Sequence, residues 1–222
     1  TEKITNINIS QNFRYITKPN KNSLITDRDY SAGFEIEFQS LSNFSIDFSY
    51  PYTYLDSEFN VTRRDGAVPI PIGGYSYPNL EISFRNSFFN EFTYFFEVGG
   101  GQFFNGTKKS IQARIGYRIE PIVQTSLNIS YDKIELPKPY DNAGLWLIGP
   151  KINFTFSKKL FWSNYIQYSN IGESLGINSR LQWRFAPLSD FYLVYNDNYF
   201  ASDIFAPKLR SLTFKLSYWF NI

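Results

Sequence analysis

The stretch FEIEF holds the pair of residues that comes closest to catalytic chemistry in this chain. Glu35 and Glu37 are two positions apart, and in a β-strand that spacing puts both carboxylates on one face, about 7 Å from each other. Two carboxylates separated by about 5–9 Å can act as the acid and base of a glycosidase. The alternative is a charged barrel wall in which arginines balance the carboxylates. Because charges recur in the middle of many predicted strands, we favour the charged wall and predict no catalytic residue.

A second stretch, GQFFNGTK at 101–108, resembles a phosphate-binding loop of the form G-x-x-x-x-G-K-[ST]. Thr107 and Lys108 stand in the reverse order, and no helical pattern follows to supply the helix N-terminus that holds phosphate. The glycines at 99–101 are better explained by a bend or by close approach of neighbouring strands. We therefore expect no nucleotide site.

Cysteine and histidine are both absent from the sequence. Without cysteine there is no disulfide framework and no thiolate metal site, and without histidine the commonest general base and metal ligand is missing. The 22 basic and 20 acidic residues give a net charge of +2, which provides no electrostatic case for nucleic acid. We expect a protein without enzymatic activity, without a cofactor or metal, and without a nucleic-acid partner.

Apolar and polar residues alternate with a period of two along almost the whole chain, which is typical of β-strands. In NFSIDFSY, for example, Phe44, Ile46 and Phe48 share one face, whereas Ser45 and Asp47 share the other. The alternation predicts about twelve strands. They are expected at residues 4–17, 28–41, 43–54, 76–88, 92–104, 109–120, 123–135, 145–157, 160–170, 174–186, 190–199 and 208–222.

The apolar face of these strands consists mainly of large residues, and aromatic residues make up 20% of the chain. A tight soluble core needs small residues to interdigitate with large ones, whereas outer-membrane barrels present large apolar residues to lipid and gather aromatic residues at the interfaces. No apolar run reaches the roughly 18 residues of a transmembrane helix. The sequence therefore predicts an all-β fold, a transmembrane antiparallel up-and-down β-barrel. A soluble ligand-binding β-barrel is the alternative.

The expected connections form two sets of different length. Short ones are expected at 40–43, 86–91, 119–123, 157–160 and 186–190, and long ones at 18–29, 55–75, 133–145 and 198–208. Short periplasmic turns and long outer loops are the layout of outer-membrane barrels. We accordingly expect the protein in the bacterial outer membrane, surrounded by its lipid.

The segment SLTFKLSYWFNI ends the sequence with a further alternation, and its apolar face is predicted to contact lipid. Leu216, Tyr218, Phe220 and Ile222 form a candidate assembly signal, similar to the terminal pattern that the outer-membrane insertion machinery binds during assembly. The chain contains no methionine, even at position 1. We therefore expect it to be part of a longer precursor.

The last third of the chain is more specific. The stretch NSRLQWRFAPLSDFYLVYNDNYF, followed by RSLTFKLSYWFNI, resembles the C-terminal barrel of large Bacteroidota outer-membrane proteins that carry an N-terminal carbohydrate-binding-module family-nine-like domain. VPIPIGGYSYP and GGGQFFNGTKKS fit the same family pattern. The resemblance implies that residues 1–222 are the C-terminal portion of a longer chain, that the barrel is larger than twelve strands, and that the protein is linked to carbohydrate handling.

Charged residues on the polar face of the predicted strands are candidates for the lining of a lumen: Glu35, Glu37, Asp47, Glu81, Arg85, Arg114, Arg118, Glu120, Arg180, Arg184 and Lys215. These side chains could set the ion preference of an aqueous pore, or pair with one another and fill the interior. We expect a single barrel domain that acts as a membrane anchor or as a component of a surface complex, with loops 55–75 and 198–208 contacting a partner. A porin-like diffusion or uptake channel is the alternative.

Overall fold

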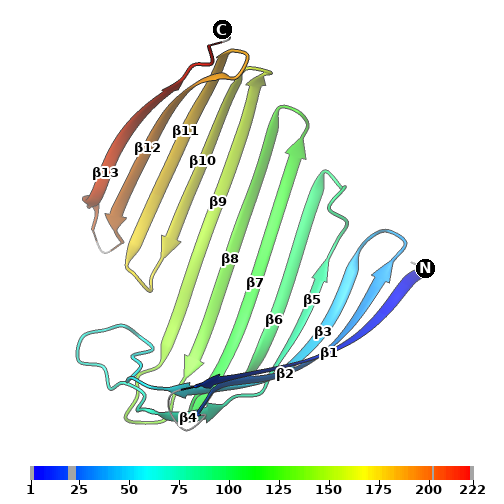
Figure 1. Cartoon of the computed structure of the whole chain (residues 1–222), viewed down its shortest axis with the longest axis vertical. Coiled ribbons are helices and arrows are strands. Elements are labelled where there is room, and N and C mark those ends of the chain that lie inside the picture. The colour runs from blue at the N-terminus through cyan, green and yellow to red at the C-terminus, as the bar shows by residue number, and fades with distance from the viewer. Residues whose placement is uncertain (1–2, 20–23, 202, 221–222) are drawn as a thin grey trace. The chain divides into compact units, whose positions relative to one another are not determined.

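The computed structural model describes residues 3–19, 24–201 and 203–220. In these residues the fold is all-β, and thirteen strands form one antiparallel sheet in which neighbours in the sequence are neighbours in space (Figure 1). The short strand β4 is the exception, because it pairs beside β5 with the same partner, β3. The predicted all-β, antiparallel, up-and-down architecture is therefore confirmed. The described part of the chain contains no helix long and apolar enough to cross a membrane.

The strands are long, and most are joined directly to the next. Their bounds are β1 (Ile4–Lys18), β2 (Leu24–Phe38), β3 (Asn43–Leu55), β4 (Gly73–Ser76), β5 (Asn79–Arg85), β6 (Phe92–Phe103), β7 (Gly106–Ile119), β8 (Val123–Glu135), β9 (Ala143–Ser157), β10 (Leu160–Ser169), β11 (Ser174–Ala186), β12 (Ser189–Phe200) and β13 (Asp203–Ser217). In the described strand order β1 and β13 each have a single neighbour, β2 and β12 respectively.

Strand β4 is the strand that the sequence pattern did not predict. It pairs with the end of β3, where Tyr52 is opposite Ser76, while β5 pairs with the beginning of β3, where Asn43 is opposite Arg85. Pro78 lies between the two strands and has no N–H to donate, so a continuous ladder is interrupted there. The surrounding stretch is rich in proline and glycine, which are typical of turns and loops, so the sequence pattern did not indicate a strand there.

Two of the four long connections were predicted too long. Strands β1 and β2 remain paired as far as Lys18 and Leu24, and β12 and β13 as far as Phe200 and Asp203. The pairing of β12 with β13 continues there through register shifts near Asn198 and Tyr199. Pro207 is tolerated because β13 is an edge strand of the described sheet. The long connections at 56–72 and 136–142 are present as expected.

The chain divides into two compact units, and the boundary passes through β6, β7, β8 and β9. Unit 1 comprises Thr1–Asn90, Tyr94–Ala113 and Ser130–Leu145, and unit 2 comprises Glu91–Thr93, Arg114–Ile129 and Trp146–Ile222.

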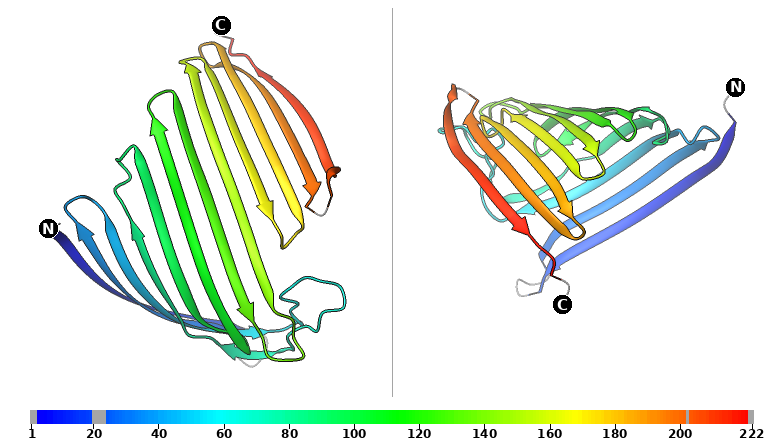
Figure 2. Two further views of the ribbon diagram at one scale, coloured as in Figure 1. Left: turned by 180° about the vertical axis from the view of Figure 1, so that it is seen from behind. Right: turned by 90° about the horizontal axis from the view of Figure 1, so that it is seen from above.

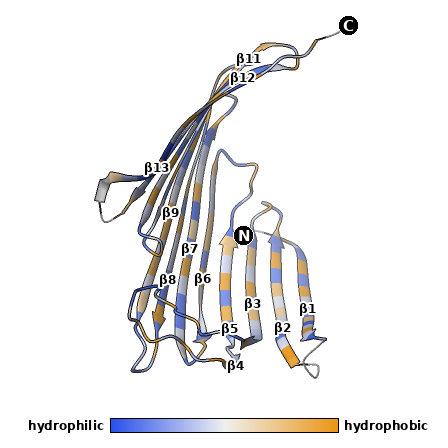
Figure 3. Cartoon of the chain, turned by 60° about the vertical axis from the view of Figure 1, so that its left-hand side comes forward, coloured by the Kyte–Doolittle hydropathy of each residue, from blue (hydrophilic) through white to orange (hydrophobic). Residues whose placement is uncertain are grey.

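In unit 1 the strand register aligns apolar residues into rows. One row runs across β1, β2, β3, β5 and β6 through Ile9, Phe34, Ile46, Ile82 and Val98. Hydropathy accordingly alternates in bands along these strands (Figure 3). No residue of the row is buried: Phe34 and Ile46 are half-buried, and 73% of Ile9 and 51% of Val98 are accessible. Large apolar residues on an exposed sheet face are unusual for a soluble protein.

The buried hydrophobic side chains of unit 1 lie in the loop 56–72 and at the ends of β8 and β9. Ile70, Ile134 and Ala143 are the buried hydrophobic residues in the described part of the chain. The loop 56–72, drawn in cyan in Figure 2, is held by an antiparallel bridge between Phe59 and Ile70. The bridge thus closes the loop around a buried residue, Ile70.

A cluster of five rings, the aromatic cluster, anchors this loop: Phe59, Tyr75, Tyr77, Phe103 and Phe104. Phe104 is at its centre, with its ring centroid 5.4 Å from that of Phe59, 5.2 Å from that of Tyr75 and 5.4 Å from that of Tyr77. The Tyr75 hydroxyl donates to the carbonyl oxygen of Pro71 at 2.8 Å.

In unit 2 the strands β9 to β13 lie side by side in both views of Figure 2. Their register aligns apolar residues into rows, as it does in unit 1. One apolar row runs through Phe154, Trp162, Leu181, Leu193 and Phe214. The rings of Phe154 and Trp162 stack with their centroids 5.7 Å apart. This row is also accessible, including 64% of Phe214.

The last strand ends earlier than the alternation predicted. Strand β13 ends at Ser217, so Leu216 belongs to it while Tyr218 and Phe220 do not. The backbone N–H of Trp219 donates to the Ser189 hydroxyl at 3.1 Å instead of continuing the ladder. Tyr218 and Phe220 pack edge to face at 4.5 Å. Ile222 lies outside the described residues.

Candidate functional site

The polar face of unit 1 gathers carboxylates from four neighbouring strands. The register aligns Glu35, Ser45, Ser83 and Glu97 in one row, and Gly33, Asp47, Glu81 and Gly99 in the next. Glu37 and Arg85 are both paired with Asn43 in a third row. All five residues predicted from this part of the chain, Glu35, Glu37, Asp47, Glu81 and Arg85, therefore share one face. We call Glu35, Asp47, Glu81 and Glu97 the acidic surface.

Glu97 is a member of the acidic surface that sequence reasoning missed. It precedes the glycine run at 99–101 in β6, where the alternation of apolar and polar residues is weak. Its position follows only from the pairing of β6 with β5, which puts it opposite Ser83. The sequence did contain a signal for its position: Glu97 lies between Phe96 and Val98, so on a strand it is on the face opposite these two apolar residues and on the same face as Gly99.

Neutral groups and one cation bind the carboxylates of the acidic surface. Asn43 donates to Glu35 Oε1, and Arg85 Nη2 lies 3.9 Å from the same oxygen. Ser45 Oγ lies 2.9 Å from Asp47 Oδ2 and 2.9 Å from Ser83 Oγ. These contacts surround a shallow hollow of about 230 Å³. Glu35 is thus held by an amide and a guanidinium, in the manner of a structural wall residue.

Glycines leave room for the acidic side chains. A Cβ on Gly33 would lie 2.7 Å from Asp47 Oδ1, and one on Gly99 would lie 2.9 Å from Glu81 Cγ. Neither the spacing nor the contacts form a metal centre, since the described residues contain no group of three or more His, Cys, Asp or Glu side chains suited to a metal ion. Within the described residues the acidic surface therefore bears charge without a metal-binding group.

The stretch that resembles a phosphate loop forms a β-hairpin. It spans the end of β6 and the beginning of β7, so no helix follows it. Lys108 Nζ lies 3.4 Å from Asp132 Oδ1, and a Cβ on Gly101 would lie 2.1 Å from the carbonyl oxygen of Pro78. The expectation of close strand approach at these glycines is confirmed.

The polar face of unit 2 is basic. Arg180 is paired with Val194, and Lys215 with Tyr192, so both lie on the face opposite the row of Leu181, Leu193 and Phe214. Lys151 lies in the row that includes Tyr165 and Asn178 on this same face. Arg114 Nε donates to Asn128 Oδ1 at 2.7 Å. We call Lys151, Arg180 and Lys215 the basic surface.

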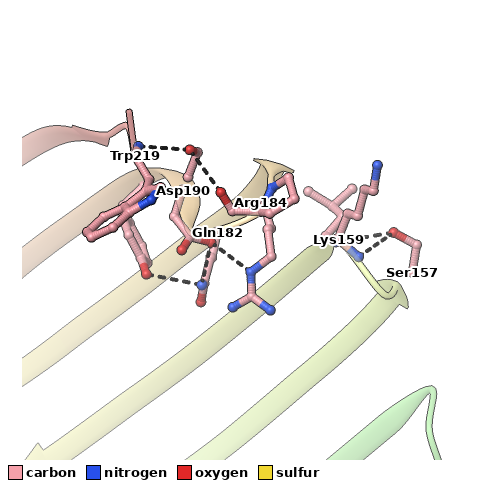
Figure 4. A network of polar contacts seen from close by, with 10 residues as sticks. Ser157, Lys159, Gln182, Arg184, Asp190 and Trp219 are labelled. Atoms are coloured by element: carbon pink, nitrogen blue, oxygen red, sulfur yellow. Dashed lines mark hydrogen bonds and ion pairs between the residues drawn. The ribbon is translucent and has the colours of Figure 1, made fainter. Parts of the chain in front are cut away.

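Two of the predicted arginines in unit 2 pair within their own neighbourhood. Arg118 Nη1 lies 3.3 Å from Glu120 Oε1, in the turn that follows β7. Arg184 Nε donates to Asp190 Oδ1 at 3.3 Å, and Gln182 Nε2 donates to the same oxygen at 3.0 Å (Figure 4). The hypothesis that the predicted charges pair with one another holds for Arg118 and Glu120, whereas Arg184 pairs with Asp190, which is not one of the predicted residues.

The network in Figure 4 ties together two short turns and the end of β13. The N–H of Arg184 donates to the carbonyl oxygen of Lys159 at 2.7 Å, and Ser157 Oγ accepts from the N–H of Lys159 at 3.2 Å. Ser189 Oγ donates to Pro187 O and accepts from Trp219 N–H. These contacts stabilise the end of unit 2 at which β9 connects to β10 and β11 connects to β12.

The apolar face of unit 2 carries a polar cluster that sequence reasoning missed. Asp197 is fully buried on this face, and Arg210 Nε donates to its Oδ2 at 2.7 Å. Tyr199 donates to the same oxygen at 2.6 Å, and Tyr195 donates to it as well. In the adjacent row Ser179 Oγ donates to Asn164 Oδ1 at 2.7 Å. The sequence signal for this cluster is the presence of polar residues at positions where the alternation predicts apolar ones.

No protein-family model, curated protein or solved structure matches this chain.

Proposed function

We propose that this chain forms the wall of an outer-membrane β-barrel, with its apolar face toward lipid and its polar face toward water. The observation that carries the proposal is the continuity of the apolar rows. Five strands of unit 1 align Ile9, Phe34, Ile46, Ile82 and Val98, and all five are at least partly accessible. Outer-membrane barrels present such a band of apolar side chains to hydrocarbon.

The alternative of a soluble ligand-binding barrel is less consistent with the burial. Such a barrel would bury the apolar side chains of its strands in an interior core. In the described residues the buried hydrophobic side chains are Ile70, Ile134 and Ala143, which lie beside a loop or at strand ends. Phe214 and Leu216 are 64% and 68% accessible.

Lipid also imposes a requirement on the edges of the sheet. Backbone groups exposed to hydrocarbon must all be hydrogen-bonded, whereas β1 and β13 each have one described neighbour. In a membrane the free edges of these strands must be paired. The resemblance to the C-terminal barrel of a longer Bacteroidota protein would supply further strands of the same chain for this purpose.

Within the membrane, the role we favour is an anchor or a component of a surface complex linked to carbohydrate handling. The ordered loop 56–72, with its own bridge and aromatic cluster, supports this role because a partner binds a preformed loop at a smaller entropic cost. The second candidate is a porin-like channel, which is favoured by Lys151, Arg180 and Lys215, cations with no described ion pair.

Two adjacent positions in β13 test the assignment of faces to lipid and water. In a background with the four native tryptophans changed to phenylalanine, Phe214→Trp would place a tryptophan on the apolar face and Thr213→Trp would place one on the polar face. After reconstitution into vesicles with brominated acyl chains, we expect strong quenching at position 214 and little at 213. Equal quenching at the two positions, or none at 214, would contradict the proposal.

Conductance separates the two roles. A porin-like channel should raise the conductance of a planar bilayer in discrete steps, whereas an anchor with a filled interior should insert without conducting. Insertion without steps would remove the channel alternative and leave the assignment of faces intact.

A further inference from the structure

A groove on the polar face of unit 2 combines two cations with neutral polar groups. It has a volume of about 650 Å³ and is lined mainly by Lys151, Asn153, Ser163, Tyr165, Asn178 and Arg180. The register puts Asn153, Ser163 and Arg180 in one row, and Lys151, Tyr165 and Asn178 in the next. We refer to these six residues as the basic groove. Its volume falls within the range of about 300–1,000 Å³ for small-molecule sites.

The two cations of the basic groove are uncompensated. Neither Lys151 nor Arg180 forms an ion pair with any described residue, and no acidic residue lines the groove. The nearby carboxylate of Asp190 already accepts from Arg184 and Gln182. The groove therefore has a positive potential that a ligand can neutralise.

The position of the cations suits a ligand larger than a single ion. Lys151 is in β9 and Arg180 is in β11, two strands away, which corresponds to about 10 Å across the sheet. Ser163 and Tyr165 of β10 lie between them. A ligand above β10 can receive charge-assisted hydrogen bonds from both cations, while amide and hydroxyl groups beneath it are available to its neutral polar groups.

Strand β9 leaves space for the ring of Tyr165. A Cβ on Gly149 would lie 3.0 Å from the Tyr165 hydroxyl and 3.2 Å from its Cε2. The glycine therefore permits the ring to lie along the sheet at one end of the groove. The Asn128 side chain donates to the carbonyl oxygen of Gly149 at 3.4 Å and supports this position from β8.

We propose that the basic groove binds a small hydroxylated organic anion, such as a sugar acid or a sugar phosphate. Lys151 and Arg180 would neutralise the carboxylate or phosphate, and Asn153, Asn178 and Ser163 would bind the hydroxyl groups. The site goes beyond the proposed function, because binding to this face needs neither conduction nor a partner. Since the groove is open to solvent, its affinity should fall as ionic strength rises.

Calorimetry on the folded chain in detergent micelles tests the proposal with four probes: glucuronate, glucose 6-phosphate, glucose and inorganic phosphate. We expect one or both of the sugar anions to bind, and to bind at least tenfold more tightly than glucose or inorganic phosphate. The relative affinity of the two sugar anions distinguishes a carboxylate ligand from a phosphate ligand. If neither sugar anion binds, or if the sugar anion that binds is no tighter than its control (inorganic phosphate for glucose 6-phosphate, glucose for glucuronate), the proposal is wrong.

Variants assign the binding to the groove. Arg180→Gln and Lys151→Gln should each weaken binding of the better sugar anion about tenfold, because a hydrogen bond to a charged group is lost. Lys158→Gln removes the same charge from the turn between β9 and β10, outside the groove, and should have little effect. Circular dichroism of each variant checks that the sheet is retained. Equal weakening by all three variants would show a general charge effect and overturn the site.

Discussion

Arg210 donates its Nε proton to Asp197 Oδ2 at 2.7 Å, and this ion pair lies on the apolar face of unit 2. Asp197 is completely buried, whereas 55% of the Arg210 side chain is accessible. The hydroxyls of Tyr195 and Tyr199 also donate to Asp197. Three donors replace the water lost by Oδ2, whereas the buried Oδ1 accepts no hydrogen bond from the described residues.

Removing the cation should leave a buried carboxylate without its charge partner. We expect Arg210→Gln to lower the free energy of unfolding by about 2–3 kcal/mol. This loss is at or below the usual cost of breaking a buried ion pair, because the Arg210 side chain is partly exposed. The double variant Asp197→Asn, Arg210→Gln should recover at least half of that loss, because no buried charge remains. Urea unfolding in detergent micelles measures both. Strictly additive effects of the two substitutions would show that the pair is not coupled.

Gly101 and Gly100 offer a matched test of close strand approach. A Cβ on Gly101 would lie 2.1 Å from the backbone oxygen of Pro78, whereas the nearest atom to a Cβ on Gly100 is 3.4 Å away. Gly101→Ala should therefore cost about 1–3 kcal/mol of stability, since backbone must move, and Gly100→Ala should be nearly neutral. The difference between their urea midpoints is the measurement. If both alanines are tolerated equally, strands β5 and β6 are not in close contact there.

The acidic surface contains a direct cross-strand pair of like charges, Asp47 opposite Glu81. Like charges in this arrangement are destabilising by a few tenths to about 1 kcal/mol. Glu81→Gln should thus raise the free energy of unfolding, and the gain should shrink in high salt because screening already weakens the repulsion. Glu120→Gln is the control, since Glu120 lies 3.3 Å from Arg118 and its loss should not stabilise the chain. A gain that is independent of salt would point to a cause other than repulsion.

Phe104 should hold the loop 56–72 in its folded conformation through the aromatic cluster. Phe104→Ala removes the ring that contacts Phe59, Tyr75 and Tyr77, so the loop should open more often. Trypsin can report this opening, because Arg63 and Arg64 lie in the loop. We expect cleavage after these arginines to become at least tenfold faster than in the unaltered chain.

Phe88→Ala provides the comparison for the loop experiment. Phe88 is 68% accessible in another connection and packs against Phe89 at 4.1 Å. Its loss should leave tryptic cleavage in the loop 56–72 unchanged. Similar acceleration by both substitutions would indicate general loosening of the chain and not release of this loop.

The alternation of side chains by itself determined the all-β fold and put Glu35, Asp47 and Glu81 each on the polar face of its own strand. The reason is local: in a strand, side chains at positions i and i+2 point the same way whatever the partner strand is. For the same reason the absence of helix after Gly106, at the apparent phosphate loop, could be predicted correctly.

Pairing between distant segments decided the rest. Glu97 joins the acidic surface only because β6 is in register with β5, and Asp197 is buried only because Tyr195, Tyr199 and Arg210 surround it. The end of β13 at Ser217 likewise depends on a contact from Trp219 to Ser189, thirty positions away. Periodicity in a sequence specifies the face on which a residue lies, whereas register, neighbours and strand ends depend on contacts that form only when the sheet is assembled.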